Sequence, residues 1–181
     1  MNLPPTISRS IGRRKLFLVY GEAATGKTHI AYEIYKYAAS QGLNPVFIAT
    51  EPGTATFLSA VGGEFIRVLS LDELARQTTY HAAMERYIVV DSINWHYRET
   101  PGPDGGRMLA YISALLREAG GFVTAQVSGE DGEPSGAPYI TPWASAVGVT
   151  RRGDGIFLVE LLKPVKRLLG FRIRGTSLEW L

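Results

Sequence analysis

The chain has 181 residues, of which 45% are hydrophobic and 20% are charged, and it contains no cysteine. Length and apolar content predict one folded domain over residues 1–181 and exclude a chain that is disordered throughout. The lack of cysteine excludes disulfides, a thiolate nucleophile and any zinc or iron–sulfur site with cysteine ligands.

Charge is unevenly distributed along the chain. Residues 151–181 carry seven basic and three acidic side chains, whereas residues 1–150 carry 12 basic and 14 acidic ones. Clustered cations neutralise phosphates, so the basic tail indicates a nucleic-acid or partner surface. A solvated strand face is the alternative interpretation.

Residues 1–14 form an N-terminal arm with basic residues but no apolar segment of signal-peptide length. The longest apolar runs, such as LFLVY and YIVV, are far shorter than the roughly 20 residues of a membrane span. We therefore expect a soluble, cytoplasmic protein with no membrane partner.

Short apolar runs alternate with amphipathic segments from residue 15 onward. The runs predict strands at Lys15–Tyr20, Pro45–Thr50, Phe65–Leu69, Tyr87–Asp91 and Phe122–Val127. Helical spacing predicts helices over Thr28–Ala39, from the capping box Ser70–Glu73 to about Glu85, and after Asp104 as N-cap, with Met108, Leu109, Ile112, Leu115 and Leu116 on one face. Continuously apolar strands separated by helices predict an α/β fold with a mainly parallel central sheet and helices on both faces.

The pattern changes near residue 144. Three segments at Ala144–Arg151, Ile156–Leu162 and Phe171–Arg174 read as strands with no room for crossover helices, which predicts a C-terminal antiparallel extension. Two stretches, Ile93–Gly106 and Ser128–Pro142, fit no regular element and are expected to be long functional loops.

Residues 21–28 read GEAATGKT and match the phosphate-binding pattern G-x-x-x-x-G-K-[ST] between a strand and a helix. Glycines let the backbone N–H groups surround phosphates, the lysine places a charge on the β- and γ-phosphates, and the threonine hydroxyl can ligate Mg²⁺. The predicted ligands of ATP are Gly21, Glu22, Ala23, Ala24, Thr25, Gly26, Lys27 and Thr28.

Three polar residues end other strands at the same predicted edge. Asp91 ends YIVVD and is the candidate for holding Mg²⁺ with Thr28; a strand-end cap is the alternative. Glu51 ends PVFIAT and is the candidate general base; an exposed turn residue is the alternative. Gln126 ends FVTAQ and is the candidate γ-phosphate sensor, or else a structural amide.

Together these segments resemble the RecA/RadA recombinase superfamily, and in particular the short archaeal RadA paralogues that consist of the ATPase core. GEAATGKT is similar to Walker A, TEPG at Thr50–Gly53 to the segment with the catalytic glutamate, VVDSI at Val89–Ile93 to Walker B, and AQV at Ala125–Val127 to the N-Q-V segment. The resemblance implies a RecA-like P-loop NTPase fold, with Lys27, Glu51 and Gln126 as catalytic residues.

The resemblance also implies contacts with DNA and with other subunits. Residues 93–106 and 128–142 occupy the positions of the family's two DNA loops, although Glu130, Asp131 and Glu133 make the second one acidic. Candidate DNA-binding residues are Trp95, Arg98, Arg151 and Arg152, with loop anchoring as the alternative for Trp95. Candidate cationic fingers toward a neighbouring subunit's nucleotide are Lys163 and Lys166, or else two solvated lysines.

Two further observations concern single residues. His29, His81 and His96 lack ligand spacing, which favours structural roles over metal binding. Phe57 either approaches the adenine or packs in the core.

The favoured hypothesis is an ATP- and Mg²⁺-dependent ATPase that binds DNA, single-stranded DNA above all, and acts as an accessory factor in recombinational repair. A recombinase partner or self-association would fit this role. One alternative is a small phosphotransferase of nucleoside-kinase type, and another is a non-hydrolysing regulator that uses nucleotide as an assembly ligand.

Overall fold

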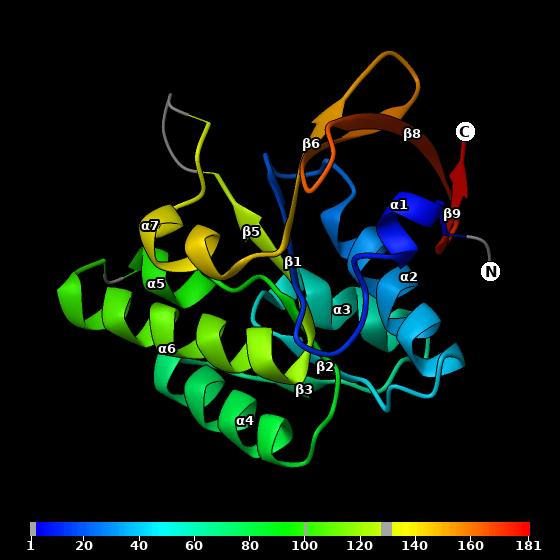
Figure 1. The fold of residues 1–181 in the computed structure, drawn as a ribbon. Helices are drawn as coiled ribbons and strands as arrows, with labels where there is room; N and C mark the ends of the chain where they lie inside the picture. Colours follow the sequence, from blue (N-terminus) through cyan, green and yellow to red (C-terminus); the bar gives the residue numbers. More distant parts are fainter. Residues whose placement is uncertain (1–2, 100, 128–131) are drawn as a thin grey trace.

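The computed structural model describes residues 3–99, 101–127 and 132–181 (Figure 1). Its elements in chain order are α1 (Pro5–Ser8), β1 (Leu16–Gly21), α2 (Lys27–Ser40), β2 (Val46–Ala49), α3 (Pro52–Ala60), β3 (Ile66–Arg67), α4 (Leu71–Ala83), β4 (Ile88–Asp91), α5 (Trp95–Glu99), α6 (Pro103–Ala119), β5 (Gly121–Gln126), α7 (Ala137–Ile140), the 3₁₀ turn η1 (Thr141–Trp143), β6 (Ala146–Arg152), β7 (Phe157–Lys163), β8 (Arg167–Arg174) and β9 (Ser177–Trp180).

All the described strands belong to one sheet, in the order β3-β2-β4-β5-β1-β6-β7-β8-β9. The first six in this order pair in parallel, and β6 to β9 pair in antiparallel fashion. The chain is therefore a mixed α/β structure with a large central sheet of mostly parallel strands, which is consistent with a Rossmann or RecA-like α/β fold.

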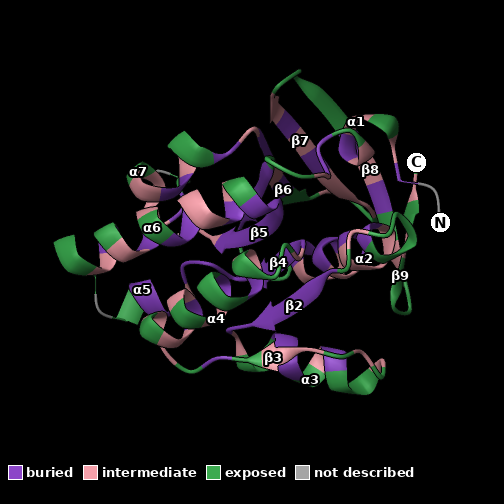
Figure 2. Cartoon of the chain, turned by 60° about the horizontal axis from the view of Figure 1, so that its bottom comes forward, coloured by how far each residue is buried: buried purple, intermediate pink, exposed green. Residues whose placement is uncertain are grey.

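Helices cover both faces of the parallel strands, which explains why those strands are apolar at every position. On one face, Phe17 and Phe122 pack with Ile34 of α2. On the other face, Leu18 and Val123 pack with Ile112 of α6. Successive residues of a strand point to opposite faces, so both sets must be apolar. Figure 2 shows the resulting buried centre with exposed helix surfaces around it.

The predicted capping box on α4 is confirmed. The Ser70 side chain accepts a hydrogen bond from the Glu73 backbone N–H at 3.1 Å, and the Glu73 carboxylate accepts from the Leu69 N–H at 2.8 Å. These bonds satisfy backbone N–H groups that have no partner within the helix.

Asp104 does not cap α6, contrary to the prediction. The N-cap is Gly102 and α6 starts at Pro103, so Asp104 lies in the first helical turn. Proline is favoured at that first position because its missing N–H would have no partner there. A carboxylate in the first turn still complements the positive end of the helix.

The two stretches expected to be irregular contain short helices. Residues 93–106 hold α5 and the start of α6, and the described part of 128–142 holds α7 and η1; residues 128–131 lie outside the described part. Four-residue and five-residue helices contain too few periods to leave a pattern. Two other short elements, α1 and β9, were likewise missed, as was α3.

β6 was expected to belong to the antiparallel extension, but only one of its two neighbours pairs with it in antiparallel fashion. It pairs in parallel with β1 and in antiparallel fashion with β7. The extension thus begins at β7 and continues the same sheet. Within the described residues, no helix is both long and apolar enough to cross a membrane.

Candidate nucleotide-binding site

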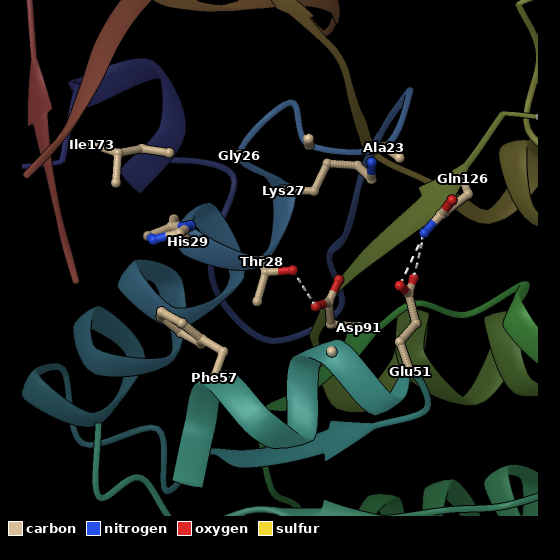
Figure 3. Close-up of a pocket in the computed structure, with 12 residues that line it drawn as sticks. Ala23, Gly26, Lys27, Thr28, His29, Glu51, Phe57, Asp91, Gln126 and Ile173 are labelled. Carbon is tan, nitrogen blue, oxygen red and sulfur yellow. Dashed lines mark hydrogen bonds between the residues drawn. The ribbon is translucent and has the colours of Figure 1, made fainter. Parts of the chain in front are cut away.

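The candidate site lies at the carboxyl edge, meaning the edge of the sheet where β1, β2, β4 and β5 end. A pocket of about 470 Å³ opens there. Its lining residues are Ala23, Ala24, Gly26, Lys27, Thr28, His29, Glu51, Gly53, Phe57, Asp91, Gln126 and Ile173 (Figure 3). The structure thus brings the residues predicted for metal, base and sensor roles to one pocket with five of the eight predicted phosphate ligands, while the other three, Gly21, Glu22 and Thr25, line a separate hollow.

The phosphate loop depends on glycine at two places. A Cβ on Gly21 would lie 2.5 Å from the backbone oxygen of Thr150 on β6, a contact that backbone cannot relieve. Gly26 has φ +87°, and its Cβ would lie 2.9 Å from the ring of Phe171 on β8. The loop is therefore held against β6 and β8, and the antiparallel extension fixes its shape.

Lys27 is 7% exposed and points along the inside of the loop (Figure 3). Its Nζ donates to the carbonyl oxygens of Gly21 at 2.9 Å and Glu22 at 2.6 Å. Burial lowers the pKa of this ammonium, while the nearby carboxylates of Asp91 and Glu51 oppose that shift. A bound phosphate would be an anionic acceptor for the Lys27 ammonium in place of these two carbonyl oxygens.

Asp91 and Thr28 are in direct contact. The Thr28 hydroxyl donates to Asp91 Oδ2 at 2.8 Å. Thr54 of α3 donates to the same oxygen at 2.6 Å, and Thr124 of β5 donates to Oδ1. Asp91 is 1% exposed, so these three hydroxyls orient a buried carboxylate.

This donor set fits Mg²⁺. A hydroxyl and a carboxylate are hard oxygen ligands, and Mg²⁺ in phosphate loops takes one or two such protein ligands plus phosphate oxygens and water. No group of three or more His, Asp or Glu that could hold a metal occurs among the described residues. A site of this kind needs only Thr28 and Asp91 from the protein.

Glu51 and Gln126 form a pair at one end of the pocket. The Gln126 Nε2 lies 2.9 Å from both carboxylate oxygens of Glu51. Burial, and then the charge of Asp91, raise the pKa of Glu51, and the hydrogen bond from Gln126 opposes this. A carboxylate with a raised pKa is a stronger base, which suits the abstraction of a proton from water.

Arg98 connects this pair to a second hollow. Its Nη1 donates to Gln126 Oε1 at 3.3 Å. Arg98 also lines a pocket of about 430 Å³ together with Trp95, Glu99 and Ser135. Two of the candidate DNA-binding residues, Trp95 and Arg98, therefore line one hollow, and Arg98 also contacts the Gln126 side chain.

His29, Phe57 and Ile173 gather at the end of the pocket opposite Glu51 and Gln126 (Figure 3). The rings of His29 and Phe57 are 4.8 Å apart. Burial lowers the pKa of His29, which favours the neutral form of its imidazole. Two aromatic rings and an aliphatic side chain can hold the flat face of a nucleobase.

The remaining predicted residues lie away from the pocket. Arg151 and Arg152 are exposed at the end of β6, where they line a separate hollow beside Gly21, and Arg151 pairs with Glu160 at 3.1 Å. Lys163 ends β7 and Lys166 follows it, at the opposite edge of the sheet, and the Lys163 Nζ donates to the Thr141 carbonyl at 3.5 Å. These lysines do not reach the pocket of their own chain.

Several site residues were missed from the sequence. His29 was given a structural role, yet its position directly after Thr28 places it in the pocket. Thr124 had a signal, since it is polar inside the apolar strand FVTAQ. Asn94 accepts from the Gln126 N–H at 3.0 Å and donates to the Gln126 carbonyl at 2.8 Å; its only sequence signal was its position three residues after Asp91.

Comparison with known proteins assigns no family to the chain. No protein-family model matches it, and no curated protein matches it either. The resemblance carried by the motifs therefore stays a hypothesis, and the functional proposal depends on the geometry described above.

Proposed function

We propose that the protein is an ATP-binding, Mg²⁺-dependent ATPase with a RecA/RadA-like core that binds DNA and acts as an accessory factor in homologous recombination and repair. The observation that carries this proposal is the convergence in one pocket of Lys27, the Thr28–Asp91 contact and the Glu51–Gln126 pair. These residues come from four different strand ends, so chance proximity in sequence does not account for their meeting.

Each group has a distinct task in the proposed reaction. The loop N–H groups and Lys27 bind the β- and γ-phosphates. Thr28 and Asp91 would hold Mg²⁺, which neutralises charge on the phosphates when it is bound. Glu51 accepts a proton from the attacking water, and Gln126 positions the Glu51 carboxylate.

The base of the nucleotide would lie against His29, Phe57 and Ile173. This end of the pocket is apolar and aromatic, whereas the opposite end carries the Glu51–Gln126 pair. The polarity of the pocket thus matches a nucleotide with its base at one end and its terminal phosphate at the other. This match also supports ATP, rather than a simple phosphate ester, as the ligand.

One observation favours a second candidate, the non-hydrolysing regulator. Both oxygens of Glu51 lie at hydrogen-bonding distance from Gln126, so the carboxylate is occupied in this arrangement. A base must release at least one of these contacts to take a proton from water. A slow or conditional ATPase fits this arrangement as well. The phosphotransferase alternative needs an Arg-rich lid late in the chain, where antiparallel strands are found.

The test is the steady-state ATPase rate with and without single-stranded and double-stranded DNA, in wild type and in Glu51→Gln. We expect Mg²⁺-dependent turnover that falls about 100-fold or more in Glu51→Gln, since general bases typically contribute 10²–10⁴. The affinity for ATP should be retained, because glutamine keeps the shape of the side chain. Equal rates in the two proteins would contradict the role of Glu51, and ATP binding without turnover would favour the regulator.

A further inference from the structure

A cationic surface lies at the amino edge of the sheet, opposite the candidate nucleotide pocket. It is formed by residues 12–15 before β1, 117–120 before β5, 141–145 before β6 and 163–167 between β7 and β8. Strand pairing makes these segments neighbours, because Phe17 pairs with Ala146, Val147 with Lys163 and Leu161 with Arg167. We refer to these four segments as the amino-edge surface.

The amino-edge surface is strongly basic. Its segments contain seven cationic residues and one acidic residue, Glu118. The cations are Arg13, Arg14, Lys15, Arg117, Lys163, Lys166 and Arg167. Arg13 pairs with Glu85 at 3.6 Å, and no ion pair involves the other six within residues 3–99, 101–127 and 132–181.

Two of these cations contact the turn that carries an exposed tryptophan. Arg117 donates to the carbonyl oxygen of Trp143, and Lys163 donates to that of Thr141, each at 3.5 Å. The turn η1 is thereby held between α6 and β7, with Trp143 40% exposed. Cations that border β5, β1, β7 and β8 and an aromatic ring before β6 are the two components of a single-strand binding surface.

The carboxyl edge is less suited to a phosphate chain. Its described segments 21–27, 50–53, 91–99, 132–136, 151–156 and 174–177 contain six acidic and five basic residues. A bound nucleotide would add further negative charge there. A second polyanion at this edge would be repelled, whereas the amino-edge surface offers unpaired cations.

We propose that single-stranded DNA binds across the amino-edge surface, with Lys166 and Arg167 on its phosphates and Trp143 stacked on a base. This inference rests on the DNA binding in the proposed function and changes its location, from the edge with Arg98, Arg151 and Arg152 to the opposite edge. A membrane surface would instead require an amphipathic helix whose apolar face is free to enter the headgroup region, whereas the apolar residues Ile112 and Leu116 of α6 are buried in the core.

The test is fluorescence anisotropy of a labelled oligo-dT with the full chain, comparing two charge reversals. Lys166→Glu with Arg167→Glu changes the amino edge, and Arg151→Glu with Arg152→Glu makes the same change of net charge on a hairpin at the carboxyl edge. The first pair should weaken binding at least about tenfold and reduce the slope of log K against log salt by about 1.4, since each contact with a single strand contributes about 0.7. The second pair should weaken binding less than about threefold, through net charge alone.

Trp143 offers a readout that does not depend on charge. Trp143→Ala should weaken binding about fivefold or more, because stacking on one base contributes about 1–3 kcal/mol, and Trp143→Phe should restore most of it. Thermal melting by circular dichroism checks folding. If the variant with Lys166→Glu and Arg167→Glu does not fold, Lys166→Gln with Arg167→Gln replaces it. This second variant should also weaken oligo-dT binding, by a smaller factor.

Several results would overturn the inference. One is a greater loss of oligo-dT affinity in the variant with Arg151→Glu and Arg152→Glu than in the variant with Lys166→Glu and Arg167→Glu. The others are an equal loss in both variants, or binding to anionic vesicles without binding to oligo-dT. ATP turnover with no oligo-dT binding by the wild type would overturn it while leaving the ATPase intact. Conversely, oligo-dT binding lost at the amino edge in a protein without ATPase activity would support it and reject the proposed reaction. Loss of ATP turnover in the Lys166 and Arg167 pair with oligo-dT binding unchanged would point to cationic fingers instead.

Discussion

The two proposed binding sites, at opposite edges of the central sheet, differ in how they would attract anions. The carboxyl edge has more acidic than basic side chains among its described segments, yet it holds the phosphate loop. The phosphate binding proposed there would depend on backbone N–H groups, the N-terminus of α2 and one buried lysine. The DNA site proposed at the amino edge would instead depend on many exposed cations, since the described segments there contain no phosphate loop. A phosphate loop of fixed geometry recognises one ligand of defined shape, whereas exposed Lys and Arg side chains accept any phosphate chain.

The largest expected effect separates ATP binding by the phosphate loop from DNA binding by the exposed cations of the amino edge. Lys27→Ala removes the ammonium from the loop, and we expect ATP turnover to fall at least about 100-fold, as for other preorganised charge-stabilising groups. Oligo-dT binding should be unchanged, because Lys27 lies at the other edge. Both are measured on one preparation, with Lys36→Ala on the same helix as a control for net charge. Loss of both activities in Lys27→Ala alone would mean that the edges act as one site.

The next prediction concerns how the antiparallel extension supports the phosphate loop. Gly26→Ala introduces a Cβ at φ +87° against the fully buried ring of Phe171, and we expect a loss of about 2–4 kcal/mol in the free energy of unfolding from strain and overpacking combined. ATP affinity should fall as well.

Gly42→Ala is the matched control for this substitution. Gly42 has φ +71° with nothing within 4 Å of its added Cβ, so only the strain of about 1 kcal/mol remains. Urea unfolding of both variants measures the difference between them. Equal losses would show that Phe171 does not constrain the loop.

The sequence predicted the carboxyl edge far better than the amino edge, for a physical reason. A phosphate loop requires particular residues at fixed spacing, and an apolar strand that ends in Asp91 places that residue at a known edge. The amino-edge surface has no such spacing. Arg14, Arg117 and Lys166 are far apart in the chain and become neighbours only through strand pairing and the packing of α6.

The parts of the site that were not predicted also depend on contacts between distant parts of the chain. The contact of Ile173 with the pocket requires β8 to fold back over α2, a tertiary arrangement without a local signal. The position of β6 beside β1 similarly depends on long-range pairing. By contrast, the buried strands and the capping box followed from local pattern alone, and both were predicted to within about two residues at most boundaries.

A smaller effect is expected for the pH dependence of turnover. Hydrolysis requires Glu51 as a carboxylate, so the rate falls as the pH drops through a pKa that burial and Asp91 have raised above its usual value. The hydrogen bond from Gln126 favours the charged form, so Gln126→Ala should move the acidic limb of the kcat profile to higher pH. The midpoint of the limb is compared with that of Gln41→Ala, an exposed glutamine at the end of α2. A limb that stays in place or moves to lower pH would contradict the pairing.

The smallest expected effect is the coupling between the two ligands, and it tests the comparison of the edges most directly. β1 has six residues and joins the two edges, so they are separated by about 20 Å at a rise of about 3.3 Å per residue. The Debye length at physiological ionic strength is about 8 Å, so bound ATP and bound DNA should hardly repel each other. Saturating ATP should therefore change the Kd for oligo-dT less than about twofold, and linkage requires the same factor for ATP affinity at saturating oligo-dT. A coupling of tenfold or more at this salt would place the DNA beside the pocket, near Arg98 and Gln126, rather than at the amino edge.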